Sequence, residues 1–169
     1  MKTIQYEIAT CFGQGPIPRR TELVKHDGVE PFLKEDAEKA FTGKSWSDIY
    51  NHLTAVKDQV FSADYHLEEW SILEPGPHNY YLRAYLEYLL EVLRQNEPDA
   101  QFVSFLFHEL YQAVYVHKRA AFDEAQKKVL RSLADYTNEV IKSNKGIEIE
   151  RDGIADNIRS FLTELNKNG

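Results

Sequence analysis

His108 and Glu109 have the residue types of a zinc-binding helix but not the spacing. In the HExxH motif a second histidine four residues after the first completes the metal site, and that position here is Gln112. His117 lies nine residues after His108, which puts the two side chains about 180° apart around a helix axis. One metal ion does not easily reach both rings. We therefore predict no metal site.

Other chemistry-bearing residues also lack the arrangement that catalysis needs. The glycines of segment 13–16 resemble a phosphate-binding loop, but no strand is expected before them and Pro16 lacks a backbone N–H. Glu68 and Glu69 are adjacent, so they point in different directions on a helix, which is poor geometry for an acid–base pair. No serine lies in a G-x-S-x-G elbow, and no histidine neighbours Cys11. We therefore expect neither an enzyme nor a bound cofactor.

Composition narrows the class of partner. The chain has 169 residues, of which 27 are acidic and 20 basic, and its formal net charge of -7 repels nucleic acid. Its longest apolar stretches, such as 113–116, are a few residues long, whereas a membrane span needs about 20. The single cysteine, Cys11, excludes an internal disulfide and fits a reducing compartment, and the first residues form no signal peptide. We expect a cytoplasmic protein that binds neither nucleic acid nor membranes.

The acidic excess lies in the first part of the chain and is sharpest in one stretch. Residues 1–100 hold 17 acids and 10 bases, whereas residues 101–169 hold 10 of each. Residues 58–82 contain no Lys or Arg, and their acids alternate with large aromatic side chains of the kind that anchor protein interfaces. We predict that this stretch binds a basic protein partner through four carboxylates and two aromatic anchors: Asp64, Glu68, Glu69, Glu74, Tyr65 and Trp70.

A second interpretation of the same stretch is a solvated acidic face whose aromatic side chains point into the core. One local detail favours a partner. If residues 62–70 are helical, Asp64 and Glu68 are like charges four residues apart, a pair that costs roughly a few tenths of a kcal/mol. No cation of the stretch offsets that cost, whereas a basic partner would.

Apolar residues recur at helical spacing along most of the chain, which predicts an all-α, single-domain bundle of about seven helices over residues 1–169. There is no internal repeat and no linker rich in Gly or Ser. The expected helices lie around residues 3–12, 32–41, 46–53, 78–96, 98–116, 123–145 and 154–165. Residues 147–150 alternate with period two and are the one strand-like segment.

Several helix ends carry recognisable signals. Gly43 predicts a left-handed cap, and Ser45 with Asp48 has the spacing of a capping box, as does Asp123 with Gln126. Gly146 is expected to stop the helix that begins at Asp123. The segment 74–77, Glu-Pro-Gly-Pro, predicts a break in regular structure before the long helix that follows.

Tyr81, Tyr85 and Tyr88 follow the i, i+4, i+7 spacing of one helical stripe. Core packing, with each hydroxyl reaching a partner or the surface, is the favoured interpretation. An aromatic binding groove is the alternative.

Four segments together carry a resemblance to a known group: 12–18 (Phe-Gly-Gln-Gly-Pro-Ile-Pro), 43–48 (Gly-Lys-Ser-Trp-Ser-Asp), 80–86 (Tyr-Tyr-Leu-Arg-Ala-Tyr-Leu) and 122–126 (Phe-Asp-Glu-Ala-Gln). In order and spacing the chain resembles a group of small helical bacterial proteins without an assigned function, with Arg83 where proline is usual. The resemblance implies a helical fold and transfers no catalytic residue.

In character the chain also resembles immunity proteins of interbacterial toxin systems, of the contact-dependent growth inhibition type. These are small acidic proteins that neutralise a toxin, often a nuclease with a basic cleft. An acidic face can occupy such a cleft, and long-range charge attraction speeds the encounter. We therefore expect an immunity-type inhibitor of a basic partner such as a nuclease toxin. A structural or regulatory helical adaptor without enzymatic activity is the alternative, and a small-ligand or enzymatic role is a third. The sequence leaves the oligomeric state open.

Overall fold

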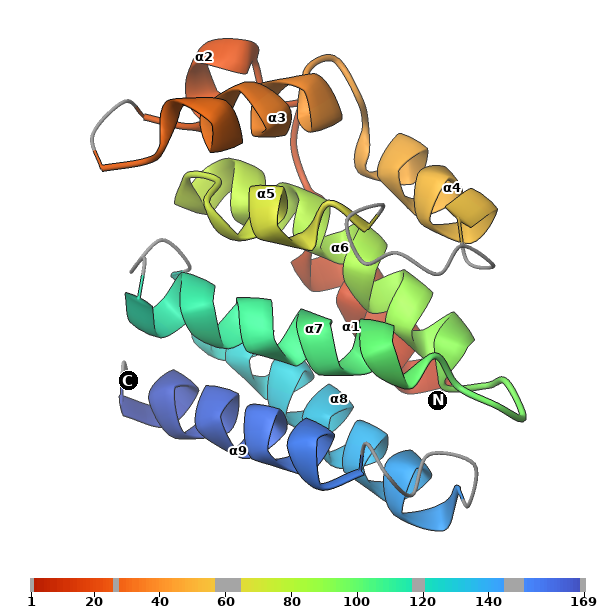
Figure 1. Ribbon diagram of the computed structural model, residues 1–169. Helices are drawn as coiled ribbons and strands as arrows, with labels where there is room; N and C mark the ends of the chain where they lie inside the picture. Colours follow the sequence, from red (N-terminus) through yellow and green to blue (C-terminus); the bar gives the residue numbers. More distant parts are fainter. Residues whose placement is uncertain (1, 26–27, 57–64, 117–120, 145–150, 168–169) are drawn as a thin grey trace.

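The computed structural model describes residues 2–25, 28–56, 65–116, 121–144 and 151–167, and its regular structure there is entirely helical (Figure 1). A π-helix directly continues the seventh α-helix. The elements are α1 (Lys2–Cys11), α2 (Arg20–Leu23), α3 (Pro31–Phe41), α4 (Trp46–Val56), α5 (Leu67–Ser71), α6 (Pro75–Val92), α7 (Ala100–Tyr111), η2 (Gln112–Val116), α8 (Glu124–Ser143) and α9 (Arg151–Lys167).

The all-α prediction is confirmed, although the described part of the chain holds nine α-helices rather than about seven. Two of them, α2 and α5, have only four and five residues. Helices of fewer than two turns are too short to show an apolar period of 3.6 residues, so periodicity does not find them. The strand-like segment 147–150 and the expected cap Gly146 lie outside the described residues.

The local cap signals are confirmed where the structure describes them. Gly43 follows α3 with φ of 72°, in the left-handed region that favours glycine. The Ser45 backbone N–H donates to Asp48 at 2.7 Å, and the Asp48 backbone N–H donates back to the Ser45 hydroxyl at 3.2 Å. Asp123 and Gln126 make the same reciprocal pair at the start of α8. Each cap satisfies N–H groups that the first helical turn leaves without partners.

The predicted break at residues 74–77 is wrong, because these residues begin α6. Glu74 is the N-cap, and Pro75 and Pro77 lie in the first turn, where the His78 N–H already donates to the Glu74 carbonyl at 2.8 Å. The first N–H groups of a helix have no intrahelical acceptor, so proline loses no hydrogen bond there and its fixed φ suits the helix. The signal marked a helix start rather than an interruption.

Helix α6 is the central element, since 12 of its 18 residues are buried. It packs against α1, α4 and α5, while α7 packs against α5 and α9, and α8 against α1 and α9. Figure 1 shows α2, α3 and α4 at one end of the molecule and α7, α8 and α9 at the other, with α5 and α6 between. One hydrophobic cluster contains buried residues from all nine of these α-helices. None of the described helices combines the length and apolar character that crossing a membrane requires.

Candidate functional site

The predicted carboxylates of the acidic stretch have three different surroundings. Glu68 on α5 is exposed. Glu69 is partly buried, with its carboxylate 3.6 Å from Nδ1 of His66. Glu74 accepts a hydrogen bond from the Lys25 backbone N–H at 3.2 Å and pairs with the Lys25 ammonium at 3.3 Å. Asp64 lies outside the described residues. Glu74 is therefore already neutralised within the chain, whereas Glu68 faces solvent.

The predicted anchors, Tyr65 and Trp70, are corrected by the structure, which places both in the core with 3% and 0% of their surface exposed. The Trp70 indole N–H donates to the His78 carbonyl at 3.0 Å, and the indole stacks on the His78 ring with centroids 4.2 Å apart. The Tyr65 hydroxyl donates to Asp99. For these two side chains the second interpretation of the stretch, aromatics pointing inward, is the one that the burial supports. Burial in a helical bundle removes them from any partner's reach.

The tyrosine stripe of α6 is also core. Tyr81 and Tyr85 are 0% exposed, and Tyr88 is 1% exposed. The Tyr81 hydroxyl lies 3.0 Å from the carbonyl oxygen of Phe41, the last residue of α3, and 2.9 Å from that of Lys44, to which it donates. Because a buried tyrosine hydroxyl needs such an acceptor, the favoured interpretation, core packing with satisfied hydroxyls, is confirmed.

The start of α5 differs from the helix that residues 62–70 suggested. Helix α5 begins at Leu67, and the preceding His66 has φ of 52°, so the helix does not extend back through His66 toward Asp64. The Tyr85 hydroxyl lies 3.0 and 3.2 Å from the carbonyl oxygens of Tyr65 and His66 and holds this turn in place. A left-handed conformation costs a non-glycine residue roughly 1–2 kcal/mol, which this contact from the central helix helps to offset. The predicted helix over residues 62–70 is therefore interrupted at His66, and Asp64 itself lies outside the described residues.

A carboxylate that the sequence did not assign, Glu109 of α7, joins Glu68 and Glu69. Partial burial raises the pKa of Glu109, the negative charges of Glu68 and Glu69 raise it further, and a hydrogen bond with Ser71 and the nearby His108 act in the opposite direction. We call Glu68, Glu69 and Glu109 the acidic junction, because it lies where α5 packs against α7. The sequence motifs drew attention to Glu109 only as part of HExxH. A glutamate is unusual in a helix that is expected to be largely buried, and that signal could have identified Glu109.

The acidic junction is short of cations. Among the described residues, no Lys or Arg pairs with Glu68, Glu69 or Glu109. Carboxylates elsewhere on the described surface do have such pairs, for example Glu38 with Arg20 and Glu87 with Arg83. The described residues hold no group of three or more His, Cys, Asp or Glu side chains arranged to bind a metal. What the junction offers chemically is attraction for a cationic side chain.

An exposed aromatic side chain stands beside the acidic junction. Phe105 precedes Glu109 by four residues on α7, so the two share one face of the helix, and 36% of its surface is exposed. Its ring is available to a partner in the way that Tyr65 and Trp70 are not. An exposed aromatic side chain on the same helix face as Glu109 is therefore found on α7, for which no anchor was predicted.

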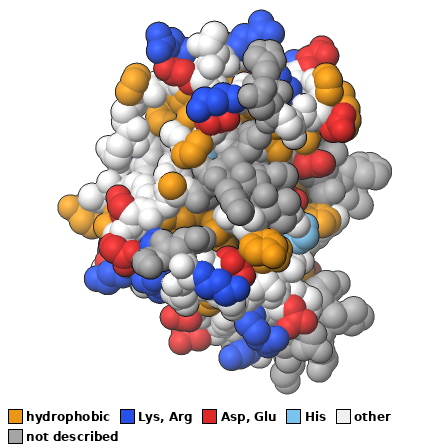
Figure 2. Space-filling model, turned by 90° about the vertical axis from the view of Figure 1, so that its left-hand side faces the viewer, with side chains coloured by type: hydrophobic (Ala, Val, Ile, Leu, Met, Phe, Trp, Pro, Cys, Tyr) orange, Lys and Arg blue, Asp and Glu red, His pale blue; other side chains and the backbone are white. Residues whose placement is uncertain are grey.

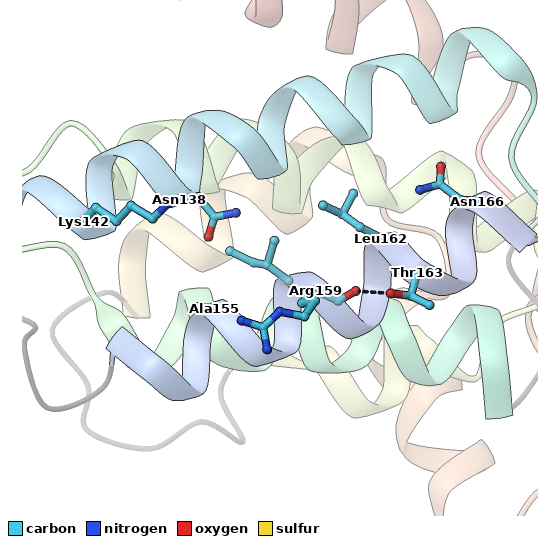
Figure 3. A pocket seen from close by; sticks show the side chains of 8 residues that line it. Asn138, Lys142, Ala155, Arg159, Leu162, Thr163 and Asn166 are labelled. Atoms are coloured by element: carbon cyan, nitrogen blue, oxygen red, sulfur yellow. Dashed lines mark hydrogen bonds between the residues drawn. The ribbon is translucent and has the colours of Figure 1, made fainter.

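A second candidate site is a groove of about 330 Å³ between α8 and α9 (Figure 3). Its polar groups come from both helices, Asn138 and Lys142 from α8 and Arg159 and Thr163 from α9, and no carboxylate lines it. Apolar side chains complete the lining: Ala155, Ile158 and Leu162. The charged side chains that line the groove are therefore opposite in sign to those of the acidic junction.

One whole face of the molecule shows how mixed the surface charge otherwise is. Figure 2 views the face at the left of Figure 1, and Lys or Arg side chains alternate there with Asp or Glu side chains and with small hydrophobic areas. The net charge of -7 is thus not gathered into one acidic patch on this face.

Residues of the segments that carried the family resemblance pack against one another. The Arg83 guanidinium lies 3.8 Å from the centre of the Trp46 ring and its Nε donates to Glu87 at 2.8 Å. Gly13 has φ of 71° and packs so closely that a Cβ there would lie 2.5 Å from Arg83 Cδ. Gln126 donates to the Cys11 carbonyl at 3.0 Å, which ties the fourth segment to the end of α1. These motif residues hold the fold together.

Comparison of the chain with protein-family models, with curated proteins and with solved structures finds no match. The acidic junction and the α8–α9 groove are therefore the two candidate sites.

Proposed function

We propose that this protein is a protein-binding inhibitor of the immunity type, which neutralises a basic partner such as a nuclease toxin through the acidic junction. The observation that carries the proposal is the packing of α5 on α7, which brings Glu68 and Glu69 near enough to Glu109 for their charges to raise its pKa, while no Lys or Arg among the described residues pairs with the three. Like charges held together on a rigid surface store unfavourable energy, and a cationic partner releases it.

The surroundings of the junction suit this role. Behind it, the buried stack of Trp70 on His78 fixes α5 against α6, so the carboxylates are presented on a rigid support. Beside it, Phe105 provides an exposed ring next to Glu109. Interfaces combine such an apolar anchor with surrounding charges, the anchor supplying affinity and the charges supplying speed and specificity of association.

The first experiment identifies the partner. The tagged protein is co-expressed with the products of the genes next to its own, captured, and washed at low and at high salt. A stoichiometric basic protein that high salt releases is the expected result, because salt screens attraction between exposed charges over about 10 Å. If no protein is retained at either salt concentration, the proposal is contradicted. That result favours the helical adaptor, which has no toxin partner.

The second experiment tests the acidic junction itself. Glu68→Lys is compared with Asp135→Lys, which reverses another exposed charge, on α8, and changes the net charge by the same two units. At low salt we expect Glu68→Lys to slow association with the captured partner about tenfold, since steering depends on charges near the contact. Asp135→Lys is expected to have a much smaller effect. Equal rates for the two variants would show that only net charge matters and would remove the junction from the interface.

A further inference from the structure

The groove between α8 and α9 has the chemistry of a second binding site, separate from the acidic junction. Its lining contains two cationic side chains, two amides and a hydroxyl above an apolar floor. Ile158 forms part of that floor and is 0% exposed, so the groove reaches down to the hydrophobic core. Binding pockets for small molecules show this same combination of an apolar lining and a few convergent polar groups.

The two cations are available to a ligand. Among the described residues Lys142 has no carboxylate within ion-pair distance. Arg159 uses Nη1 to contact Asp156 at 2.7 Å, and Asp156 does not line the groove. Since a guanidinium has five N–H donors, Arg159 retains donors for an anion. The cations stand on opposite walls, Lys142 on α8 and Arg159 on α9 (Figure 3).

Asn166 and Thr163 lie toward the end of the groove farthest from Lys142 (Figure 3). The Arg131 guanidinium donates to Oδ1 of Asn166 at 3.0 Å, which leaves the Asn166 NH₂ group as a donor. The Thr163 hydroxyl donates to the Arg159 carbonyl at 2.8 Å, as the dashed line in Figure 3 marks, so its oxygen is left to accept. The polar groups of the lining are therefore mainly donors, which suits an anion rather than a cation.

We propose that this groove binds a small amphipathic anion, a molecule with one carboxylate or phosphate group and an apolar body. Lys142 and Arg159 bind the anionic group, and Ile158 and Leu162 contact the apolar body. The volume of about 330 Å³ lies at the lower end of the range for small-molecule pockets, about 300 to 1,000 Å³, and is too small for a protein helix.

Calorimetry on the full chain tests the proposal with four probes: octanoate, octyl phosphate, octanol and inorganic phosphate. We expect octanoate or octyl phosphate to bind with a dissociation constant below about 1 mM, and the tighter of the two identifies the preferred anionic group. Octanol keeps the apolar body without the charge and is expected to bind at least about tenfold more weakly. Inorganic phosphate bound as tightly as octyl phosphate would overturn the amphipathic part of the proposal, and no binding of either anionic amphiphile would overturn it entirely.

Three variants locate the site. Lys142→Gln with Arg159→Gln is expected to weaken binding of the anionic probe about tenfold, since both charge-assisted hydrogen bonds are lost. Ala155→Phe fills the groove with a ring and is expected to abolish binding. Lys128→Gln is the matched control, because Lys128 is an exposed lysine of the same helix that does not line the groove. Equal affinity in the double variant and the control would place binding elsewhere. Circular dichroism melting shows that each variant folds.

Discussion

The acidic junction and the α8–α9 groove are built in opposite ways. The junction joins helices about 40 residues apart in sequence, and Glu68 and Glu69 immediately precede Trp70, whose buried ring stacks on His78 of α6. The groove lies between two consecutive helices, and its charged ends, Lys142 and Arg159, are exposed. A charge held near the core is rigid but electrostatically costly, whereas a charge on a flexible exposed stem is inexpensive and adaptable. The first arrangement suits a preformed protein interface and the second suits a small ligand.

The largest expected effect is on the free energy of unfolding, and it tests whether the hydrophobic core supports the acidic junction. Trp70→Ala removes a fully buried ring and should lower the free energy of unfolding by about 4 kcal/mol, or prevent folding. Leu162→Ala, at the partly buried edge of the groove, should cost about 1 kcal/mol. Urea unfolding followed by circular dichroism measures both. Losses of equal size would contradict the distinction between a core-supported site and a surface groove.

The next effect is a pH dependence confined to the junction side. His78 is 0% exposed, its Nε2 has no hydrogen-bond partner among the described residues, and burial lowers its pKa to about 4. In the unfolded chain its pKa is about 6.5, so the unfolded state binds more protons below that pH and stability falls as pH falls from about 6.5 toward 4. The difference of about 2.5 pKa units corresponds to about 3 kcal/mol.

The variant His78→Phe isolates this contribution. It keeps a ring against Trp70 and cannot be protonated, so about 3 kcal/mol of the loss between pH 6.5 and 4 should disappear from urea unfolding curves. At pH 4.5 backbone amides at the start of α6, where His78 lies, should exchange faster than those of α8. No histidine lines the groove beside α8, so histidine protonation does not open that region. An unchanged pH dependence in His78→Phe would mean that other groups control acid stability.

The smallest expected effect is the change in the free energy of unfolding when one charged side chain of either site is neutralised. At pH 7 Glu109→Gln should raise the free energy of unfolding by about 1 kcal/mol, since it removes a partly buried charge next to Glu68 and Glu69. The pKa of Glu109 is raised, so the folded protein takes up this proton first as pH falls, and the advantage of the variant should shrink toward pH 5. Lys142→Gln in the groove should change stability by less than about 0.5 kcal/mol. Chemical denaturation at pH 7 and pH 5 measures both, and a destabilised Glu109→Gln would show that its carboxylate is satisfied rather than strained.

The fold was predictable wherever the signal is local. Gly43, the Ser45–Asp48 pair and the Asp123–Gln126 pair were found from sequence because a cap is formed by residues within four positions of one another. The start of α6 was mistaken because proline and glycine mark both helix interruptions and helix first turns, and local sequence does not separate the two. Helices α2 and α5 were too short to show a period.

The candidate sites depended on contacts that spacing does not encode. Acidic and aromatic residues between 58 and 82 predicted a surface with its own anchors, yet packing of α5 on α6 buries Trp70, and packing of α5 on α7 brings Glu109 to Glu68. The groove forms because α8 and α9 pack side by side, and no sequence motif predicts that packing.

By itself the sequence determined the all-α class, the caps and the apolar stripes, because these follow from residue types at fixed spacing along one helix. Tertiary structure alone decided which aromatic rings face solvent, which carboxylates share one surface and where a groove remains open. The physical reason is that burial and electrostatic interaction depend on distances between helices, and residues far apart in the chain set those distances only once the helices have packed.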